Sequence, residues 1–173
     1  LDLVEPDNNH YLTFSKMIGE LYGYDINILE IASGIFPVFS KYIDDEQARL
    51  GKGTITAIDP YVIDKKIGNI NLVRDYFSRD MDIDGFDLIV SIKPCSCTEE
   101  ILNTARVTGK QFFVALCDCE PYQMYDFDTD MTRAEWINMM KYAAKRQASN
   151  EFNVVTYDSL PNFPNPVLYK KKK

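Results

Sequence analysis

The stretch "LEIASGIFP", residues 29–37, decides the fold: an apolar run meets a turn of small residues and then a proline. Residues 26–32, "INILEIA", form a β-rich run that predicts a strand. Pro37 suits the first turn of a helix, and Gly51 suits its end. The stretch therefore predicts a strand, a tight turn and then a helix over residues 37–50.

The same alternation continues along the chain. Strands are expected within residues 54–59, 70–77, 86–92, 111–116, 152–160 and 165–171, and helices over 9–23, 62–67, 98–109 and 132–149. Thr98 is expected to cap one helix, and Thr132 with Glu135 has the spacing of a capping box. Strands that alternate with helices indicate an α/β fold with a mainly parallel sheet, which binds ligands beyond the carboxyl ends of its strands.

Composition narrows the functional classes. The 173 residues are expected to form a single domain, residues 1–173, and no apolar run is long enough to span a bilayer. The net charge of −7 argues against a generic nucleic-acid binder, and the run Lys170–Lys173 is expected to be a solvated tail. The first ten residues lack the features of a secretory signal, and four cysteines do not suggest a disulfide scaffold. We therefore expect a cytoplasmic protein.

Acidic residues stand at the ends of the first three strands. Glu30 lies inside an apolar strand, where a carboxylate needs a partner, and the small residues 32–34 would let a ligand approach the backbone. Asp59 could accept the hydroxyls of a ribose, although its place before Pro60 also suits a simple turn. Asp75 could accept an exocyclic amine beside Tyr76, or could simply form a turn.

This set of motifs resembles the class I S-adenosylmethionine-dependent methyltransferases. The resemblance rests on "LEIASGIFP", Asp59, "RDYF" and "FDLIVS", in that order, and covers roughly residues 26–169. It implies a Rossmann-like sheet of seven strands in the order 3-2-1-4-5-7-6, with the last strand antiparallel, and S-adenosylmethionine as cofactor. The chain departs from the glycine-rich first motif of the family at Ala32 and Phe36.

The resemblance also implies which residues bind the cofactor. Glu30 and the turn 32–34 would lie by its methionine end, and Asp59 would lie on its ribose. Asp75 and Tyr76 would lie by its adenine, and the end of the fourth strand would line the methionyl side. The full set that the resemblance implies is Glu30, Ala32, Ser33, Gly34, Asp59, Pro60, Asp75, Tyr76, Ser91 and Ile92.

Four cysteines form two C-x-C pairs that follow the fourth and fifth predicted strands. Cys95 and Cys97 follow one strand, and Cys117 and Cys119 follow the other. We favour packing at the strand tips, or the lining of an acceptor pocket, without a metal. A zinc site made of all four is an alternative, although its usual spacing is C-x₂₋₄-C. A redox pair or nucleophile is another, because a thiol at a helix N-terminus, as at Cys97, has a lowered pKa.

No residue stands out as a general base, and Lys93, Cys95 and Asp118 are the nearest catalytic candidates. The loop 120–131 combines aromatic residues (Tyr122, Tyr125 and Phe127) with acids, which favours a small or cationic methyl acceptor. The leading hypothesis is thus methyl transfer from S-adenosylmethionine. A non-catalytic methyltransferase-like binding or subunit protein is the alternative, and a nucleotide-binding dehydrogenase is weaker because the glycine triplet is missing.

Overall fold

The computed structural model describes residues 9–126, 128–160 and 162–173. Its helices are α1 (Asn9–Tyr22), α2 (Val38–Leu50), α3 (Thr98–Thr108), α4 (Pro121–Met124) and α5 (Arg133–Lys145), with a 3₁₀ turn at Cys95–Cys97. Its strands are β1 (Asn27–Ile31), β2 (Thr54–Ile58), β3 (Asn71–Val73), β4 (Leu88–Ile92), β5 (Gln111–Ala115), β6 (Phe152–Tyr157) and β7 (Val167–Lys172).

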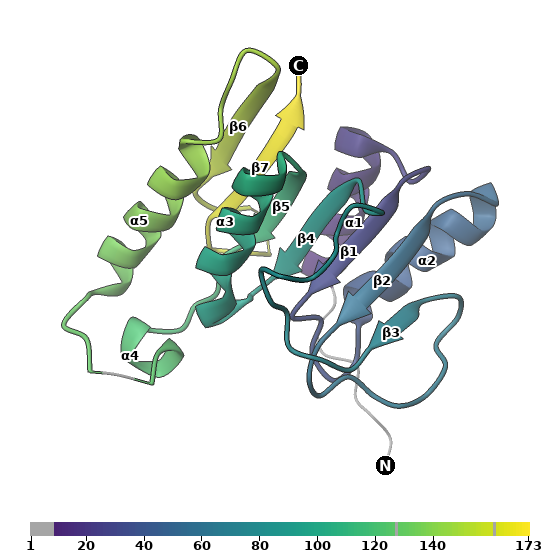
Figure 1. Cartoon of the computed structure of the whole chain (residues 1–173), viewed down its shortest axis with the longest axis horizontal. Helices are drawn as coiled ribbons and strands as arrows, with labels where there is room; N and C mark the ends of the chain where they lie inside the picture. The colour runs from purple at the N-terminus through teal and green to yellow at the C-terminus, as the bar shows by residue number, and fades with distance from the viewer. Residues whose placement is uncertain (1–8, 127, 161) are drawn as a thin grey trace.

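The strands form one seven-stranded sheet in the order β3-β2-β1-β4-β5-β7-β6. Strands β1 to β5 pair in parallel, and β7 is antiparallel to both β5 and β6. Both the order and the antiparallel strand agree with the sequence prediction. The arrowheads of β2 and β4 point to the lower edge of the sheet in Figure 1, so the carboxyl ends of the parallel strands meet there.

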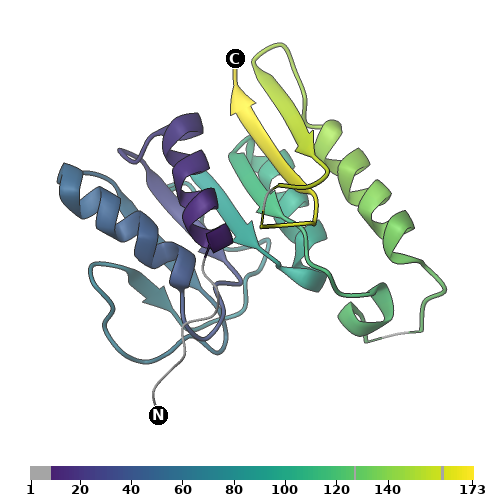
Figure 2. The ribbon, with the colours of Figure 1, turned by 180° about the vertical axis from the view of Figure 1, so that it is seen from behind.

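Helices cover both faces of the sheet. Helices α3 and α5 lie on the face turned to the viewer in Figure 1, and α1 and α2 lie on the other face, seen in Figure 2. Two apolar cores follow from these layers. Phe14 of α1 and Phe39 of α2 are fully buried in one core, and Trp136 of α5 is fully buried in the other. All five residues of β4 are buried, as expected for a central strand covered on both faces.

The structure corrects three local predictions and adds one short helix. Residues 62–67 form irregular backbone with a bend and no helix, and the short α4 was not predicted. Helix α3 begins at Thr98, whose hydroxyl donates to the carbonyl of Cys95 at 2.7 Å and does not cap the helix. The run Lys170–Lys173 is no solvated tail, because β7 extends to Lys172 and the side chain of Lys170 is buried.

The capping box predicted for α5 is confirmed. Thr132 accepts a hydrogen bond from the backbone N–H of Glu135, and the Glu135 side chain accepts one from the backbone of Thr132. Among the described residues, no helix is long and apolar enough to cross a membrane.

Candidate functional site

The turn between β1 and α2 has the backbone shape that glycine favours, even where the residue is not glycine. Ala32 has a φ of 58° and Gly34 a φ of 76°. A left-handed alanine costs roughly 1–2 kcal/mol, so the surrounding structure must hold this turn in place. A Cβ added at Gly34 would meet nothing within 4 Å. The turn thus presents open backbone at the carboxyl end of β1.

Asp59, directly after β2, ties this turn to its own strand. One carboxylate oxygen accepts from the N–H of Gly34 at 3.0 Å, and the other accepts from the N–H of Tyr61 at 2.8 Å. The backbone N–H of Ser33 donates to the carbonyl of Ile58, which fixes the turn from the same side. Each carboxylate oxygen still has a lone pair free for a second donor. Asp59 is half-buried, and Pro60 follows it at the same edge.

Glu30 lies deeper than the open turn. Its side chain is buried, and one carboxylate oxygen accepts a short hydrogen bond from the hydroxyl of Ser40 on α2. Burial raises the pKa of Glu30 to about 8, although the hydrogen bonds from Ser40 oppose this shift; the nearby Asp59 carboxylate adds to the increase. The contact with Ser40 therefore joins β1 to the first turn of α2, beneath the backbone turn.

Ser40 was missed by the sequence reasoning, although its spacing contained a signal. The buried residues of α2 include three polar ones, Ser40, Asp44 and Gln47, which lie four and three residues apart on one helical face. Each has a partner below the helix: Gln47 donates to three carbonyls, and Asp44 accepts from the N–H of Asn69. Polar residues at helical spacing on a core-facing side indicate such partners.

The predicted adenine side lies on exposed surface. The Asp75 carboxylate accepts from the N–H of the next residue, Tyr76, at 2.8 Å. Tyr76 is 67% exposed and Tyr61 is 63% exposed, and the neighbouring Tyr61 phenol raises the pKa of Tyr76. Both aromatic rings follow the strands that carry Asp59 and Asp75. Tyr61 is the member of this pair that the sequence reasoning did not include.

Ser91 and Ile92 end β4 beneath the surface. Both are buried, and the Ser91 hydroxyl donates to the backbone carbonyl of Ile31 at 2.5 Å. This bond ties β4 to the end of β1, immediately before the turn that begins at Ala32. The two residues therefore lie buried between the turn after β1 and the loops that carry the cysteines.

Three of the four cysteines converge where β4 and β5 end. The Sγ atoms of Cys95, Cys117 and Cys119 all lie within 4.8 Å of one another, and those of Cys95 and Cys119 are 3.6 Å apart. Cys117 Sγ is also 3.4 Å from the thioether sulfur of Met124 on α4. Cys97 is not part of this group and packs against the core beside α3. The neighbouring, parallel strands thus bring one cysteine of the first pair, Cys95, to both cysteines of the second, and the prediction that the two pairs meet holds for Cys95 and not for Cys97.

The thiols differ in acidity. The neighbouring Cys95 thiol lowers the pKa of Cys117 to about 6, and the interaction with Cys117, together with burial, raises the pKa of Cys95. Burial also raises the pKa of Cys119. The expectation of a lowered pKa at Cys97 is wrong: burial, with the nearby Glu100 carboxylate, raises it to about 11. Desolvation of the thiolate outweighs the helix N-terminus there.

The remaining catalytic candidates are engaged with each other. Lys93 Nζ lies 3.3 Å from the Asp118 carboxylate and 5.9 Å from the centre of the Phe163 ring. Burial opposes ionisation of Asp118, yet its backbone and Lys93 hydrogen bonds prevail and lower its pKa. An ionised, paired carboxylate of low pKa is a weak general base.

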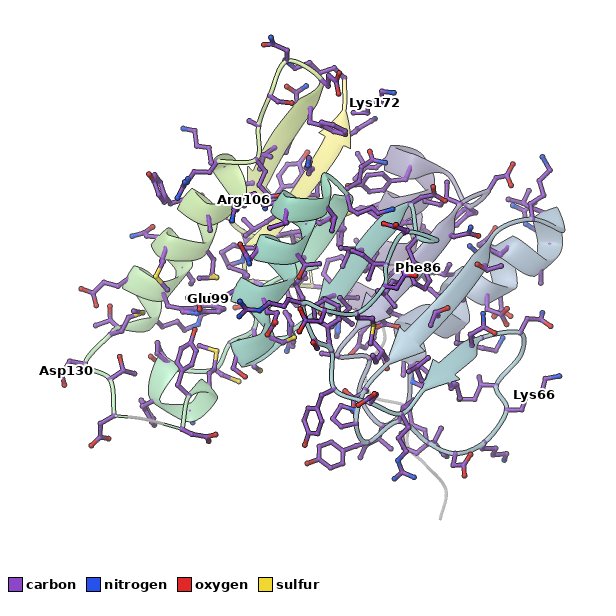
Figure 3. All side chains as sticks on the ribbon, viewed as in Figure 1. Lys66, Phe86, Glu99, Arg106, Asp130 and Lys172 are labelled. Atoms are coloured by element: carbon purple, nitrogen blue, oxygen red, sulfur yellow. The ribbon has the colours of Figure 1, made fainter. Side chains whose placement is uncertain are left out.

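The loop after β5 is anchored by its aromatic residues. The indole N–H of Trp136 donates to the Tyr125 hydroxyl at 3.1 Å, which attaches the loop to α5. Tyr122 is 64% exposed, and Asp130 points outward at the far side of the loop in Figure 3. Phe127 lies outside the described residues. The described part of the loop thus presents acids to solvent and holds one aromatic ring inward.

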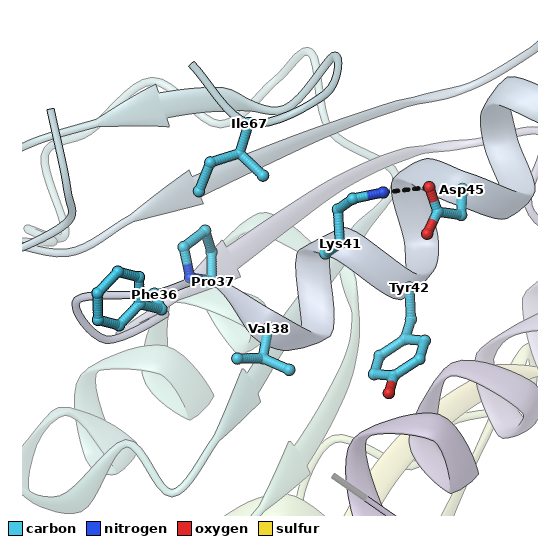
Figure 4. A pocket seen from close by; sticks show the side chains of 7 residues that line it. All are labelled: Phe36, Pro37, Val38, Lys41, Tyr42, Asp45 and Ile67. Atoms are coloured by element: carbon cyan, nitrogen blue, oxygen red, sulfur yellow. Dashed lines mark hydrogen bonds and ion pairs between the residues drawn. The ribbon is translucent and has the colours of Figure 1, made fainter. Parts of the chain in front are cut away.

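A pocket of about 410 Å³ lies on the outer side of α2, shown in Figure 4. Seven residues line it: Phe36, Pro37, Val38, Lys41, Tyr42, Asp45 and Ile67. Lys41 and Asp45 form an ion pair across one side of it. It contains none of the predicted cofactor-binding residues, so the candidate site is the open edge at the strand ends and not this pocket.

Comparisons with known proteins agree with the fold. No protein-family model and no curated protein sequence matches the chain. Among solved structures, an O-methyltransferase from Bacillus cereus in complex with SAH is similar at 8% identity with a TM-score of 0.61, over 100% of this chain and 84% of that one. The cofactor-bound Rv0187 from MTB is 9% identical with a TM-score of 0.60, over 99% of this chain and 83% of that one. The 23S rRNA methyltransferase ErmE is 12% identical with a TM-score of 0.56, over 97% of this chain and 69% of that one. The chain therefore has the Rossmann-like fold of class I methyltransferases.

Proposed function

We propose that the protein binds S-adenosylmethionine at the carboxyl ends of β1 to β4 and catalyses methyl transfer to a small acceptor. One observation carries the proposal: Asp59 already holds the turn after β1 through the N–H of Gly34, at 3.0 Å. An acid at the end of β2 beside an open turn is the arrangement that binds a ribose in Rossmann-like sheets. The exposed rings of Tyr61 and Tyr76 lie on the next loops, where a base would stack.

The residues at this edge fit the parts of the cofactor. Open backbone at Gly34 suits its methionine end, and Asp59 keeps acceptor capacity for hydroxyl groups. The bound cofactor supplies an electrophilic methyl group, so the protein mainly has to orient an acceptor and exclude water. Buried Ser91 and Glu30 support the turn through their hydrogen bonds with Ile31 and Ser40.

Charge at the rim favours a small or cationic acceptor over a nucleic acid. Five acids, Asp118, Glu120, Asp126, Asp128 and Asp130, stand on or beside the loop after β5, and all are exposed or half-buried. Two cations beside the loop are already engaged: Lys93 pairs with Asp118, and Arg133 donates to the carbonyl of Cys117 and to Asn165. A phosphate backbone would be repelled here.

Calorimetric titration with S-adenosylmethionine tests the proposal. The parent protein should bind, and Asp59→Ala should weaken binding roughly 10- to 100-fold, because hydrogen bonds to a charged group contribute about 1.5–3 kcal/mol. Asp25→Ala is the matched control. Asp25 is exposed at the other end of β1 and pairs with Lys52 at 3.0 Å, so its loss should leave the affinity unchanged.

Failure of the parent protein to bind at millimolar cofactor would overturn the proposal. Equal weakening by the two aspartate variants would remove Asp59 from the site. The second candidate, a methyltransferase-like protein that binds the cofactor without turnover, is favoured by one observation: Asp118 and Lys93 neutralise each other. Release of S-adenosylhomocysteine with a panel of small thiols and amines separates the two, because turnover excludes the second candidate.

A further inference from the structure

We propose that Cys95, Cys117 and Cys119 bind a zinc ion at the junction of the β4 and β5 loops. The three Sγ atoms lie within 4.8 Å of one another and come from two different loops. Tetrahedral zinc with Zn–S bonds of about 2.3 Å places neighbouring sulfurs about 3.8 Å apart. The 3.6 Å between the Sγ atoms of Cys95 and Cys119 is close to that value. This site is separate from the cofactor proposal and does not depend on it.

The backbone holds Cys95 in an uncommon conformation. Lys93 and Cys95 have φ values of 58° and 50°, in the left-handed region that residues with a Cβ rarely adopt. Each such residue costs on the order of 1–3 kcal/mol and persists where its surroundings determine it. In this conformation Cys95 Sγ faces Cys119, from the loop of the neighbouring strand. The geometry thus places a sulfur toward two others at a cost in backbone strain.

Simple packing explains the cysteines less well. Burial as a small apolar side chain accounts for Cys97, which packs beside α3 away from the group. It gives no reason for three sulfurs to face one another. A disulfide between Cys95 and Cys119 would use two of the three and leave Cys117 out. A thiophilic ion uses all three, and three thiolates are a donor set that zinc favours.

The surroundings suit an ion with three protein ligands. Three thiolates around Zn²⁺ carry one net negative charge, and Arg133, the first residue of α5, supplies positive charge beside them by donating to the carbonyl of Cys117 at 3.3 Å. Met124, whose thioether lies 3.4 Å from Cys117 Sγ, covers one side. The fourth position would be left for water, as in zinc sites that have three protein ligands.

The test is a metal titration of the full chain, purified anaerobically and fully reduced. Co²⁺ should give the thiolate charge-transfer band and the intense visible bands of tetrahedral coordination, and zinc should displace it at a single ion per chain. Cys119→Ser should lower zinc affinity by more than about 100-fold, since even the loss of a residue that only supports a ligand costs 10- to 100-fold. Cys97→Ser is the matched control and should bind as the parent does.

Several results would overturn the site. The first is a reduced parent protein that shows no cobalt charge-transfer band. The second is a Cys97→Ser variant that loses zinc as completely as Cys119→Ser. The third is air oxidation to a Cys95–Cys119 disulfide in a protein that binds no zinc when reduced. Circular dichroism of Cys119→Ser establishes that the variant is folded. If it is not, Cys95→Ser, at the half-buried partner of Cys119, replaces it in the same titration.

Discussion

At pH 8, the Glu30→Gln variant should unfold at a higher urea concentration than the parent protein, and this advantage should disappear toward pH 4.5. Burial raises the pKa of Glu30 from 4.5 in the unfolded chain to about 8 in the folded protein. Between these values the folded state holds a proton that the unfolded state has released. Stability therefore falls as pH rises through this window, by up to about 1.4 kcal/mol per pH unit. Glutamine is neutral at every pH and keeps an oxygen that accepts from Ser40.

The measurement is a set of urea unfolding curves across the window, followed by fluorescence of Trp136, the single tryptophan of the chain. The difference in unfolding free energy between the two proteins isolates Glu30 from other titrating groups. Asp59 and Tyr11 are the neighbours coupled to it, and both remain in each protein. Glu46→Gln, an exposed position on α2, is the control. A constant difference at all pH values would show that Glu30 is ionised in the folded state.

Apolar runs and glycine stops were enough to predict all seven strands, whereas the order of the strands was implied by the resemblance to class I methyltransferases. The parallel strands are short, and all except the exposed β3 are largely buried, so the pattern of each is local. The helix expected at residues 62–67 fails for the opposite reason. Its residues are tied to distant parts of the chain, as when the N–H of Ile63 donates to the carbonyl of Ile35. Such long-range bonds override a weak local preference.

The candidate site was predicted by position and missed in its contacts. Asp59 was expected after β2, but its bond to Gly34 depends on two strands lying side by side, which no local spacing shows. The cysteines show the same limit. The zinc alternative drawn from the sequence included all four, whereas the three that meet are one from the first pair and both from the second. Spacing within a pair does not tell which sulfurs converge across a sheet.

Gly53→Ala should destabilise the protein by roughly 3 kcal/mol or more, the largest loss we expect from removing a single hydrogen-bonding arrangement. Gly53 has a φ of 79°, and an added Cβ would lie 2.3 Å from the carbonyl oxygen of Tyr24 and 2.9 Å from that of Ile26. Both are backbone atoms that cannot move freely. The same Cβ would come within 2.7 Å of Gln47 Nε2, which donates to these two carbonyls and to that of Thr54. The alanine would strain the backbone and disturb the donor that these three part-buried carbonyls share.

The Gly51→Ala variant measures the backbone strain of a left-handed alanine by itself. Gly51 also has a left-handed φ, of 67°, but a Cβ there would meet nothing within 4 Å. The Gly51→Ala variant should therefore lose unfolding free energy through backbone strain alone, about 1–2 kcal/mol. The lower entropy of its unfolded chain reduces this loss. Urea unfolding of both variants at one pH gives the comparison. Equal losses would mean that the Gln47 bonds contribute nothing beyond the strain. A larger loss at Gly53 would show that the close packing there, the Gln47 bonds included, holds the amino ends of β1 and β2 together, and with them the register that sets Asp59 beside Gly34.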